Sequence, residues 1–397
     1  MKKTAFIRFI SPMLILGILI WSVYPIFNQE EENHTPENNR TVFSEAVMAP
    51  IDFDGKAPQN SAQSMALIDA KSRNIIFSKN SDVPRGMAST TKIMTALVAI
   101  ENFPLEQEFS IPKEAVGIEG SSVYLKEGEK LTLLELLYCL LLESGNDAAT
   151  AIAICCAGDV ETFVTIMNER AFELGLENTY FSNPHGLSHE NHKTTALELA
   201  LITATAFEYP IFREIVSTKT AKVRYNGIEN GRTLSNHNKL LYQYEGAIGV
   251  KTGYTMADGK CLVSCAERNG LTLIAVTLSD PKPNATHKAL FDSAFENFEN
   301  RIIANAGEIS AEIPTENGEK EFLTVCNGSK IALCLPKNAK IEIQLVSPER
   351  VTTPVEKGDI IAKAKCFYQG KEVYIINLEA TETIKKKKEE NFFESLF

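Results

Sequence analysis

Two short patterns in the chain place hydroxyl, amine and amide groups at spacings that suit nucleophilic catalysis. Ser89 stands three residues before Lys92 in MASTTKIMTA. Ser144 stands two residues before Asn146 in LLLESGNDAA. A serine hydroxyl is a poor nucleophile until a base removes its proton. A lysine on the same helix face can be that base where burial or a second cation disfavours its charged form, so the spacing predicts that Lys92 activates Ser89.

A third pattern, Lys251-Thr252-Gly253, opens an apolar run with the character of a strand. A glycine inside a strand often marks a point where another backbone or a ligand approaches closely. Lys251 would also be the second cation that disfavours a charged Lys92. The pattern therefore predicts a sheet edge that is open to a ligand and lies near the nucleophile.

None of these patterns is specific alone, because the chain contains decoys. Ser110 and Lys113 also fit S-x-x-K, and Ser72 and Ser78 each begin an S-x-N pattern. Context separates them from the candidates. Ser89 opens a buried helix predicted for residues 89–102, where the helix N-terminus favours developing negative charge. Ser110 has a proline inside its pattern and no buried helix behind it.

The elements that must position these residues follow from the hydrophobic periodicity. Residues 131–158 predict two buried helices separated at the Ser144-Gly145-Asn146 break, and Thr132 with Glu135 predicts a capping box at the start of the first. Residues 65–80 predict two short strands, and three more strands are expected after about residue 248. A final amphipathic helix is expected over 287–300. This order favours an α+β fold, an antiparallel sheet flanked by helices.

The composition changes after about residue 301 to short β runs separated by Gly, Asn or Pro, which predicts a small C-terminal β-sandwich-like domain. The expected organisation has five parts: an N-terminal signal or anchor segment over 1–28, a polar linker over 29–60, a catalytic domain over 61–302, the β domain over 303–380, and a basic amphipathic tail over 381–397.

The N-terminal segment predicts export. Lys2, Lys3 and Arg8 precede an apolar run that reaches about Phe27. The run approaches the ~20 residues that span a bilayer, and no A-x-A cleavage site directly follows it. An uncleaved anchor is therefore favoured over a cleaved signal peptide. The protein is expected outside the cytoplasm, attached to the outer face of the cytoplasmic membrane, or secreted if the signal is cleaved.

The C-terminal tail and the net charge of the chain predict which partners it binds. The tail carries four lysines before an apolar face of Phe392, Phe393, Leu396 and Phe397, which favours contact with an anionic membrane surface over a frayed tail. The net charge of −11 argues against nucleic acid as a partner. Most of the eight cysteines lie in apolar helix or strand runs, and they show no short zinc-type spacing, so buried thiols are expected and no metal or cofactor is implied.

In combination these motifs are specific. The chain resembles the serine D-alanyl-D-alanine carboxypeptidases, low-molecular-weight penicillin-binding proteins that share the fold of serine β-lactamases. MASTTKIMTA, LLLESGNDAA, NPHGL (183–187) and GVKTGYT (249–255) match that family in the expected order. The resemblance covers roughly residues 62–300 in detail and the β domain in outline.

The resemblance implies a role for each candidate. Ser89 forms an acyl-enzyme with Lys92 as base, and Ser144 relays a proton toward the leaving amine. Asn146 orients Lys92 or the substrate amide. The backbone N–H groups of Ser89 and Tyr254 form the oxyanion hole, in which each donor is typically worth about 3 kcal/mol.

The same resemblance implies the partners. Lys251 and Thr252, next to Gly253, bind the terminal carboxylate of a peptidoglycan stem peptide that ends in D-Ala-D-Ala. A β-lactam mimics that dipeptide and traps Ser89 as an ester. The expected activity is removal of the terminal D-Ala during cell-wall maturation.

Three alternatives have their own signatures. A class A β-lactamase would add a Glu that activates the deacylating water, and no E-x-x-L-N run lies between Asn146 and Lys251. A non-catalytic penicillin sensor would bind penicillin without releasing D-Ala. A metal site could use His185, His189 and His192, but their spacing is not H-E-x-x-H and the segment predicts a scaffolding loop.

One departure from the family pattern concerns Asp258. This carboxylate precedes Gly259 where a small residue is expected. It lies beyond the start of the KTG strand. It is therefore predicted to affect the turn that follows the strand and to leave the chemistry unchanged.

Overall fold

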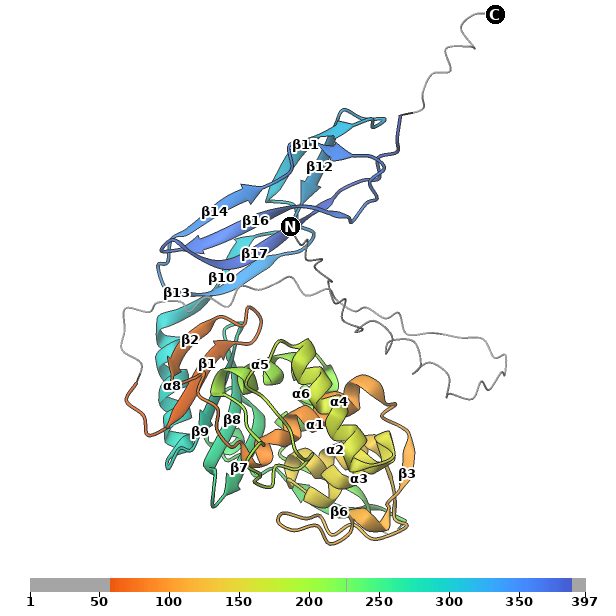
Figure 1. Ribbon diagram of the computed structural model, residues 1–397. Helices are drawn as coiled ribbons and strands as arrows, with labels where there is room; N and C mark the ends of the chain where they lie inside the picture. The colour runs from red at the N-terminus through yellow and green to blue at the C-terminus, as the bar shows by residue number, and fades with distance from the viewer. Residues whose placement is uncertain (1–57, 226, 388–397) are drawn as a thin grey trace, which may run out of the picture. The chain divides into compact units, whose positions relative to one another are not determined.

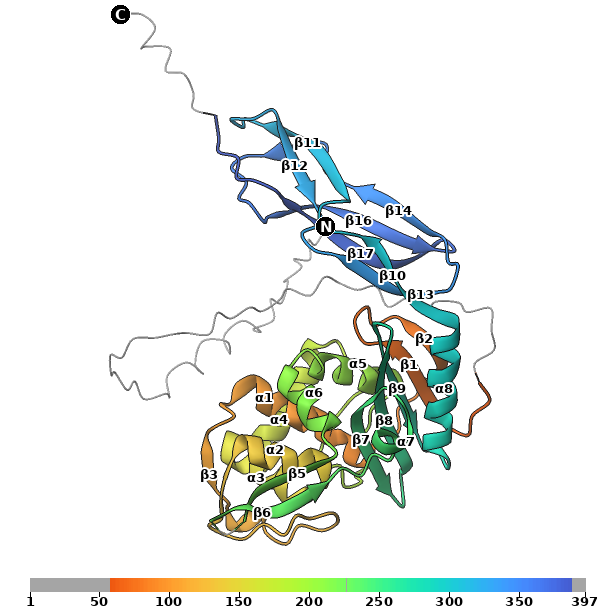
Figure 2. The same ribbon diagram turned by 180° about the vertical axis from the view of Figure 1, so that it is seen from behind.

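The computed structural model describes residues 58–225 and 227–387 (Figures 1 and 2). The predicted signal or anchor segment, all but the end of the predicted linker, and the apolar face of the predicted tail lie outside these residues. The predicted β domain and the catalytic elements lie within them.

A five-stranded antiparallel sheet forms the centre of the catalytic domain. Its spatial order is β2-β1-β9-β8-β7. Successive strands pair antiparallel, which confirms the predicted sheet. The KTG pattern lies on β7, at the edge. The strands are β1 (Ser64–Asp69), β2 (Ile75–Lys79), β7 (Ala247–Thr255), β8 (Gly259–Arg268) and β9 (Leu271–Leu278).

Helices cover both faces of this sheet, as Figures 1 and 2 show, with α5 and α1 on one side and α8 on the other. The final helix begins at Pro283, ahead of the predicted residue 287, because a proline is well suited to the first turn of a helix. The helices are α1 (Lys92–Asn102), α2 (Leu133–Leu142), α3 (Asn146–Ala157), α4 (Val160–Glu173), α5 (Ala196–Ala206), α6 (Pro210–Ser217), α7 (Leu240–Gln243) and α8 (Pro283–Asn297).

Short elements connect the helical region. The 3₁₀ turn η1 (Ala88–Thr91) leads directly into α1, so the helix predicted from Ser89 begins as a tighter turn. Two hairpins and one more 3₁₀ turn complete this part: β3 (Glu108–Ser110) with β4 (Lys130–Thr132), β5 (Thr220–Tyr225) with β6 (Ile228–Ser235), and η2 (Lys113–Ala115). Of the decoy serines, Ser110 lies on β3 and Ser78 lies on β2.

The two helices on either side of the Ser144 break are mostly buried. α2 begins at the predicted capping box, in which the Thr132 side chain accepts from Glu135 N–H while the Glu135 carboxylate accepts from Thr132 N–H. All of the first eight residues of α3 are buried. The break therefore projects from a rigid support, as the periodicity predicted.

The C-terminal part is β-rich, as predicted. β10 pairs with β13, and a six-stranded sheet has the order β14-β16-β17-β12-β11-β15. These strands are β10 (Phe298–Ala304), β11 (Ser310–Glu316), β12 (Phe322–Cys326), β13 (Ile331–Pro336), β14 (Ile341–Val346), β15 (Val351–Thr352), β16 (Ile360–Tyr368) and β17 (Lys371–Ala380).

Both limits of the β domain differ from the predicted 303 and 380. β10 starts at Phe298, directly after α8, because its pairing with β13 begins there. At the other end, Ile384 is 1% exposed and pairs with Val355 in an isolated bridge. Residues 381–387 therefore pack against the β domain, and Lys386 also forms a bridge there.

Two further observations concern membranes and thiols. No single helix in residues 58–225 and 227–387 has the length and apolarity to cross a membrane. The helices α3 and α4 reach that length and apolarity only together, as a pair bent by 88°.

All eight cysteines lie in the described part of the chain and are free thiols. Burial raises the pKa of Cys261 to about 12, so this thiol stays protonated at neutral pH.

We expect Thr132→Ala to destabilise the fold by about 1 kcal/mol, because it removes the side-chain acceptor at the N-terminus of α2. Urea unfolding measures the change. Thr165→Ala is the matched control: this exposed threonine bonds only to a carbonyl of its own helix α4, and its loss should stay within about 0.5 kcal/mol. Equal effects of the two substitutions would contradict the capping box.

Candidate active site

The Lys92 amine lies at the centre of the candidate site. Its Nζ is 3.0 Å from Ser89 Oγ, and it donates to Asn146 Oδ1 at 2.7 Å and to the main-chain oxygen of His185 at 2.5 Å. A neutral lysine has two N–H groups and one lone pair. Because the two oxygen acceptors use both N–H groups, the lone pair is left to face the hydroxyl of Ser89.

Electrostatics favour that neutral form. Lys92 is fully buried, and burial holds its pKa well below the usual range of lysine. The positive charge of Lys251 lowers this pKa further, while the carboxylate of Asp147 opposes the shift. Lys251 is also buried, which lowers its pKa to about 7, and its Nζ donates to the main-chain oxygen of Thr252 at 3.0 Å. The cleft thus disfavours two simultaneous ammonium charges.

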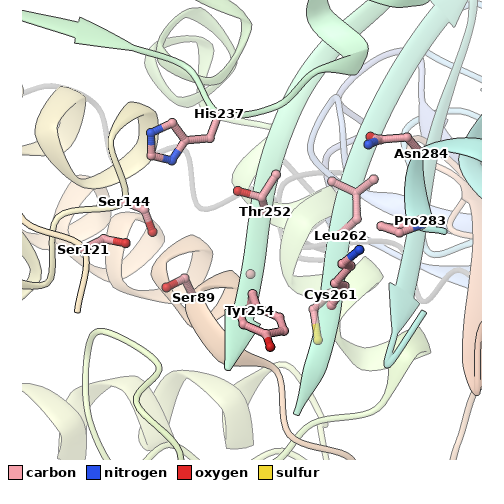
Figure 3. Close-up of a pocket in the computed structure, with 12 residues that line it drawn as sticks. Ser89, Ser121, Ser144, His237, Thr252, Tyr254, Cys261, Leu262, Pro283 and Asn284 are labelled. Carbon is pink, nitrogen blue, oxygen red and sulfur yellow. The ribbon is translucent and has the colours of Figure 1, made fainter. Parts of the chain in front are cut away.

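A cavity of about 370 Å³ opens above these groups. Figure 3 shows the Ser89, Ser144 and Thr252 side chains directed toward one space, with Tyr254 below and His237 beside Ser144. The turn η1 (Ala88–Thr91) carries Ser89 and is called the nucleophile turn. It lines the cavity together with the α2–α3 break, the strands β7 and β8, the start of α8, and single residues of two loops, Ser121 and His237. Such a site can hold a peptide end between a helix start and a sheet edge.

The structure brings all eight predicted site residues together. Five of them line the cavity: Ser89, Ser144, Thr252, Gly253 and Tyr254. The other three, Lys92, Asn146 and Lys251, are buried at its base, with 3% of the Asn146 surface exposed. The decoy Ser110 is not among the residues that line it.

The α2–α3 break fixes Ser144 and Asn146. Ser144 has a left-handed φ of +62° and is 4% exposed, so the chain turns sharply there and the side chain is held at the cavity wall. Asn146 is the first residue of α3, and its Nδ2 donates to the main-chain oxygen of Glu119 at 2.6 Å. That bond fixes the amide orientation, so Oδ1 faces Lys92.

Gly253 lies against the nucleophile turn. A Cβ added at this position would be 3.1 Å from both the Met87 oxygen and the Ser89 nitrogen, so any side chain would push β7 away from Ser89. The backbone that approaches this glycine is therefore that of the nucleophile turn. Tyr254 follows on the same edge strand with 64% of its surface exposed.

The NPHGL loop contacts Lys92 directly, a contact that the sequence patterns did not predict. His185 contributes its carbonyl to Lys92, and Thr95 Oγ1 donates to the neighbouring oxygen of Pro184 at 2.6 Å. Gly186 has φ +89°, and a Cβ there would be 2.1 Å from the Ala88 oxygen. The motif was visible in the sequence, but a contact made by a main-chain oxygen has no residue signature.

The imidazoles of this loop have local partners. Burial lowers the pKa of His185 to about 3 and that of His192 to about 4, so both are neutral. His192 Nδ1 accepts from Ser182 N–H at 3.0 Å, and its Nε2 lies 2.6 Å from Thr91 Oγ1. No group of three His, Cys, Asp or Glu side chains in the described residues is arranged to hold a metal ion. The loop therefore supports the nucleophile turn.

Asp147 was also missed. It is fully buried and accepts from the N–H groups of Val123 (3.1 Å) and Leu125 (3.0 Å) and from Ser122 Oγ (2.6 Å). These bonds tie the preceding loop to the start of α3, and Ser121 of that loop lines the cavity. An Asp in the first turn of a helix was the available signal, but the loop that it binds is remote in sequence.

Comparisons with known proteins agree with this geometry. The family model for D-alanyl-D-alanine carboxypeptidase matches residues 52–282, and that for the C-terminal domain of penicillin-binding protein 5 matches residues 298–386. The chain belongs to the D-alanyl-D-alanine carboxypeptidase family. The expected fold and peptidase class are therefore confirmed, and these are serine peptidases that act on peptidoglycan.

Individual relatives extend over most of this carboxypeptidase. D-alanyl-D-alanine carboxypeptidase DacF of Bacillus subtilis is 30% identical over 359 residues, 86% of this chain and 92% of that protein. The D-alanyl-D-alanine carboxypeptidase of Streptomyces sp. strain K15 is 38% identical over 220 residues, 51% of this chain and 76% of that protein. The crystal structure of penicillin-binding protein 5 from Haemophilus influenzae superposes with a TM-score of 0.72 at 27% identity, covering 84% of this chain and all of that one.

We expect Gly186→Ala to slow acylation of this carboxypeptidase by benzylpenicillin by about 100-fold, because its Cβ would displace the Ala88 backbone and with it Ser89. Stopped-flow or gel-based labelling measures the rate. Gly175→Ala is the control: it also replaces a glycine at positive φ, +72°, but meets no atom within 4 Å. It should cost about 1 kcal/mol of stability and leave acylation unchanged; a matching loss of rate would contradict the contact.

Proposed function

We propose that this enzyme removes the terminal D-Ala from peptidoglycan stem peptides through an acyl-enzyme on Ser89. One observation carries the assignment of roles: the two N–H groups of a neutral Lys92 are committed to Asn146 and His185, which leaves its lone pair for the Ser89 hydroxyl. A base that is buried and already oriented needs no reorganisation when the reaction begins.

The chemistry then follows in two halves. Lys92 Nζ takes the proton of Ser89 Oγ, and Oγ attacks the carbonyl carbon of the penultimate D-Ala. Negative charge develops on the carbonyl oxygen, where the N–H groups of Ser89 and Tyr254 are proposed to receive it. The C–N bond breaks, the leaving D-Ala nitrogen takes up the proton by way of Lys92 and Ser144, and an ester on Ser89 remains.

In the second half a water molecule attacks the ester carbonyl and loses a proton to Lys92. The tetrahedral intermediate expels Ser89 Oγ, which recovers that proton, and the shortened peptide leaves with a new carboxylate. No residue that lines the cavity of the described chain is a carboxylate, so the site lacks the Glu that deacylates the β-lactam in class A β-lactamases. A β-lactam is expected to stay bound as a long-lived ester.

Substrate recognition is proposed to rest on the sheet edge. Lys251 and the Thr252 hydroxyl offer a cation and a donor to the terminal carboxylate of the peptide, and the Thr252 side chain points into the cavity beside Ser144 (Figure 3). The low pKa of Lys251 in the ligand-free site means that its charge is weakly held there. A bound carboxylate favours the charged form.

We also propose that the enzyme acts outside the cytoplasm, at the outer face of the cytoplasmic membrane. The apolar run before Phe27 and the basic tail support this location, and both lie wholly or partly outside the described residues. Fractionation of cells that produce the full chain or a chain lacking residues 1–28 tests it. Recovery of the full chain in the cytoplasm would contradict the proposal.

Ser89→Ala should abolish both the benzylpenicillin adduct and D-Ala release, the latter by at least about 10³-fold, because the nucleophile is gone. Peptide mapping by mass spectrometry and a D-Ala assay measure the two activities. Ser110→Ala carries the decoy pattern and should leave both intact. Adduct formation without D-Ala release by the native enzyme would instead indicate a penicillin sensor, and rapid loss of the adduct without release would indicate a β-lactamase.

The kcat/KM for a peptide ending in D-Ala-D-Ala should depend on pH with a bell shape. It rises as Lys92 loses its proton, since only the neutral amine is a base, and falls as Lys251, with a pKa of about 7 in the free enzyme, loses the charge that binds carboxylate. Lys251→Arg should lower the overall rate and remove the descending limb, because a guanidinium stays charged. An unchanged descending limb would contradict the role of Lys251.

A further inference from the structure

The turn that precedes the nucleophile has an unusual backbone. Ala88 has φ +46°, a left-handed conformation that costs a non-glycine residue about 1–2 kcal/mol. It is fully buried and directly adjacent to Ser89. A strained residue at this place persists only where its surroundings hold it, so the contacts of its peptide groups identify what positions the nucleophile.

The N–H group of Ala88 donates to a side chain from the other end of the site, Asp258 Oδ2, at 3.2 Å. Asp258 lies in the turn between β7 and β8 and is half-buried. The oxygen of Ala88 is held separately, because it accepts from Thr91 Oγ1 at 2.8 Å. Both polar groups of the strained residue are therefore satisfied, one of them by Asp258.

Gly86 leaves the space that the Asp258 carboxylate occupies. A Cβ added to Gly86 would lie 1.9 Å from Asp258 Oδ1, and the φ of Gly86 is outside the left-handed region. The backbone conformation therefore does not require glycine here; the space required by the carboxylate does. Gly86 and Asp258 are complementary although 172 positions separate them in the chain.

The same carboxylate reaches a third segment. Ser188, which follows the NPHGL loop, has its Oγ 3.2 Å from Asp258 Oδ2 and 2.9 Å from Thr255 Oγ1. The N–H of Asp258 donates to Thr255 Oγ1 at 2.9 Å. The nucleophile turn, the loop that holds Lys92 and the end of β7 are thus joined at one carboxylate.

Two of these segments carry the proposed oxyanion donors. Ser89 N follows Ala88, and Tyr254 N precedes Thr255 on β7, where Gly253 already touches the nucleophile turn. We propose that Asp258 is a positioning residue that sets the spacing of the two oxyanion N–H groups by fixing the Ala88 backbone to the β7–β8 turn. This inference rests on the proposed acyl-enzyme mechanism and replaces the expectation that Asp258 affects the turn alone.

The test compares Asp258→Ala with Asp258→Asn in the full chain. Asp258→Ala should lower both kcat on a D-Ala-D-Ala peptide and the rate of acylation by benzylpenicillin by about 10- to 100-fold, with KM changed by less than about threefold, because the oxyanion forms only after binding. Asp258→Asn keeps an oxygen acceptor for Ala88 N–H and should recover most of the rate. Asp82→Ala removes an exposed acidic residue six positions before Ala88 in the chain and should leave the kinetics unchanged.

A double-mutant cycle with Gly86 separates positioning from general stability. Gly86→Ala should slow acylation in the native background, because the added methyl displaces the carboxylate, but should slow it little further in Asp258→Ala. Thermal unfolding of each variant is measured alongside. Additive losses, or a loss of unfolding temperature with unchanged kcat in Asp258→Ala, would overturn the positioning role. Retained D-Ala release by Ser89→Ala would instead overturn the proposed function itself.

Discussion

The constraint on which the site depends is the burial of one amine. Lys92 has no exposed surface, so burial and the charge of Lys251 disfavour its ammonium form more than the Asp147 carboxylate favours it. The protein satisfies the neutral amine instead, with an amide oxygen from α3 and a carbonyl from the NPHGL loop. Those two acceptors come from segments far apart in the chain. The packing of α1, α3 and the loop therefore orients the lone pair, and through it the nucleophile.

The second buried lysine is electrostatically coupled to the first. Lys251 lowers the pKa of Lys92 when it is charged, and burial alone lowers its own pKa to about 7. In the proposed mechanism, a carboxylate that binds beside Lys251 favours its ammonium form. An amidated peptide end would lose this ionic contact.

The sequence predicted those parts of the site that depend on side-chain type and local periodicity. The S-x-x-K helix start, the break at Ser144 and the KTG strand each have a local signature, and so does the capping box at Thr132. The parts that it missed are made by backbone atoms or by contacts across the fold. Neither the contact of the His185 carbonyl with Lys92 nor the left-handed backbone of Ala88 has a signature in the linear sequence. The domain limit at Phe298 was missed because strand pairing, not composition, determines where β10 begins.

The positions of three glycines and of Asp258 show how contacts between segments far apart in the chain hold the site together. An oxyanion hole made of two backbone N–H groups cannot be tuned by changing its own side chains, so its geometry depends on what holds the two strands of backbone. Gly253 and Gly186 both allow close approach to the nucleophile turn, and Gly86 leaves room for the Asp258 carboxylate. In the proposed arrangement, the Asp258 carboxylate at the end of β7 accepts from Ala88 N–H and so fixes the nucleophile turn to the β7–β8 turn, which a small residue at this position could not do.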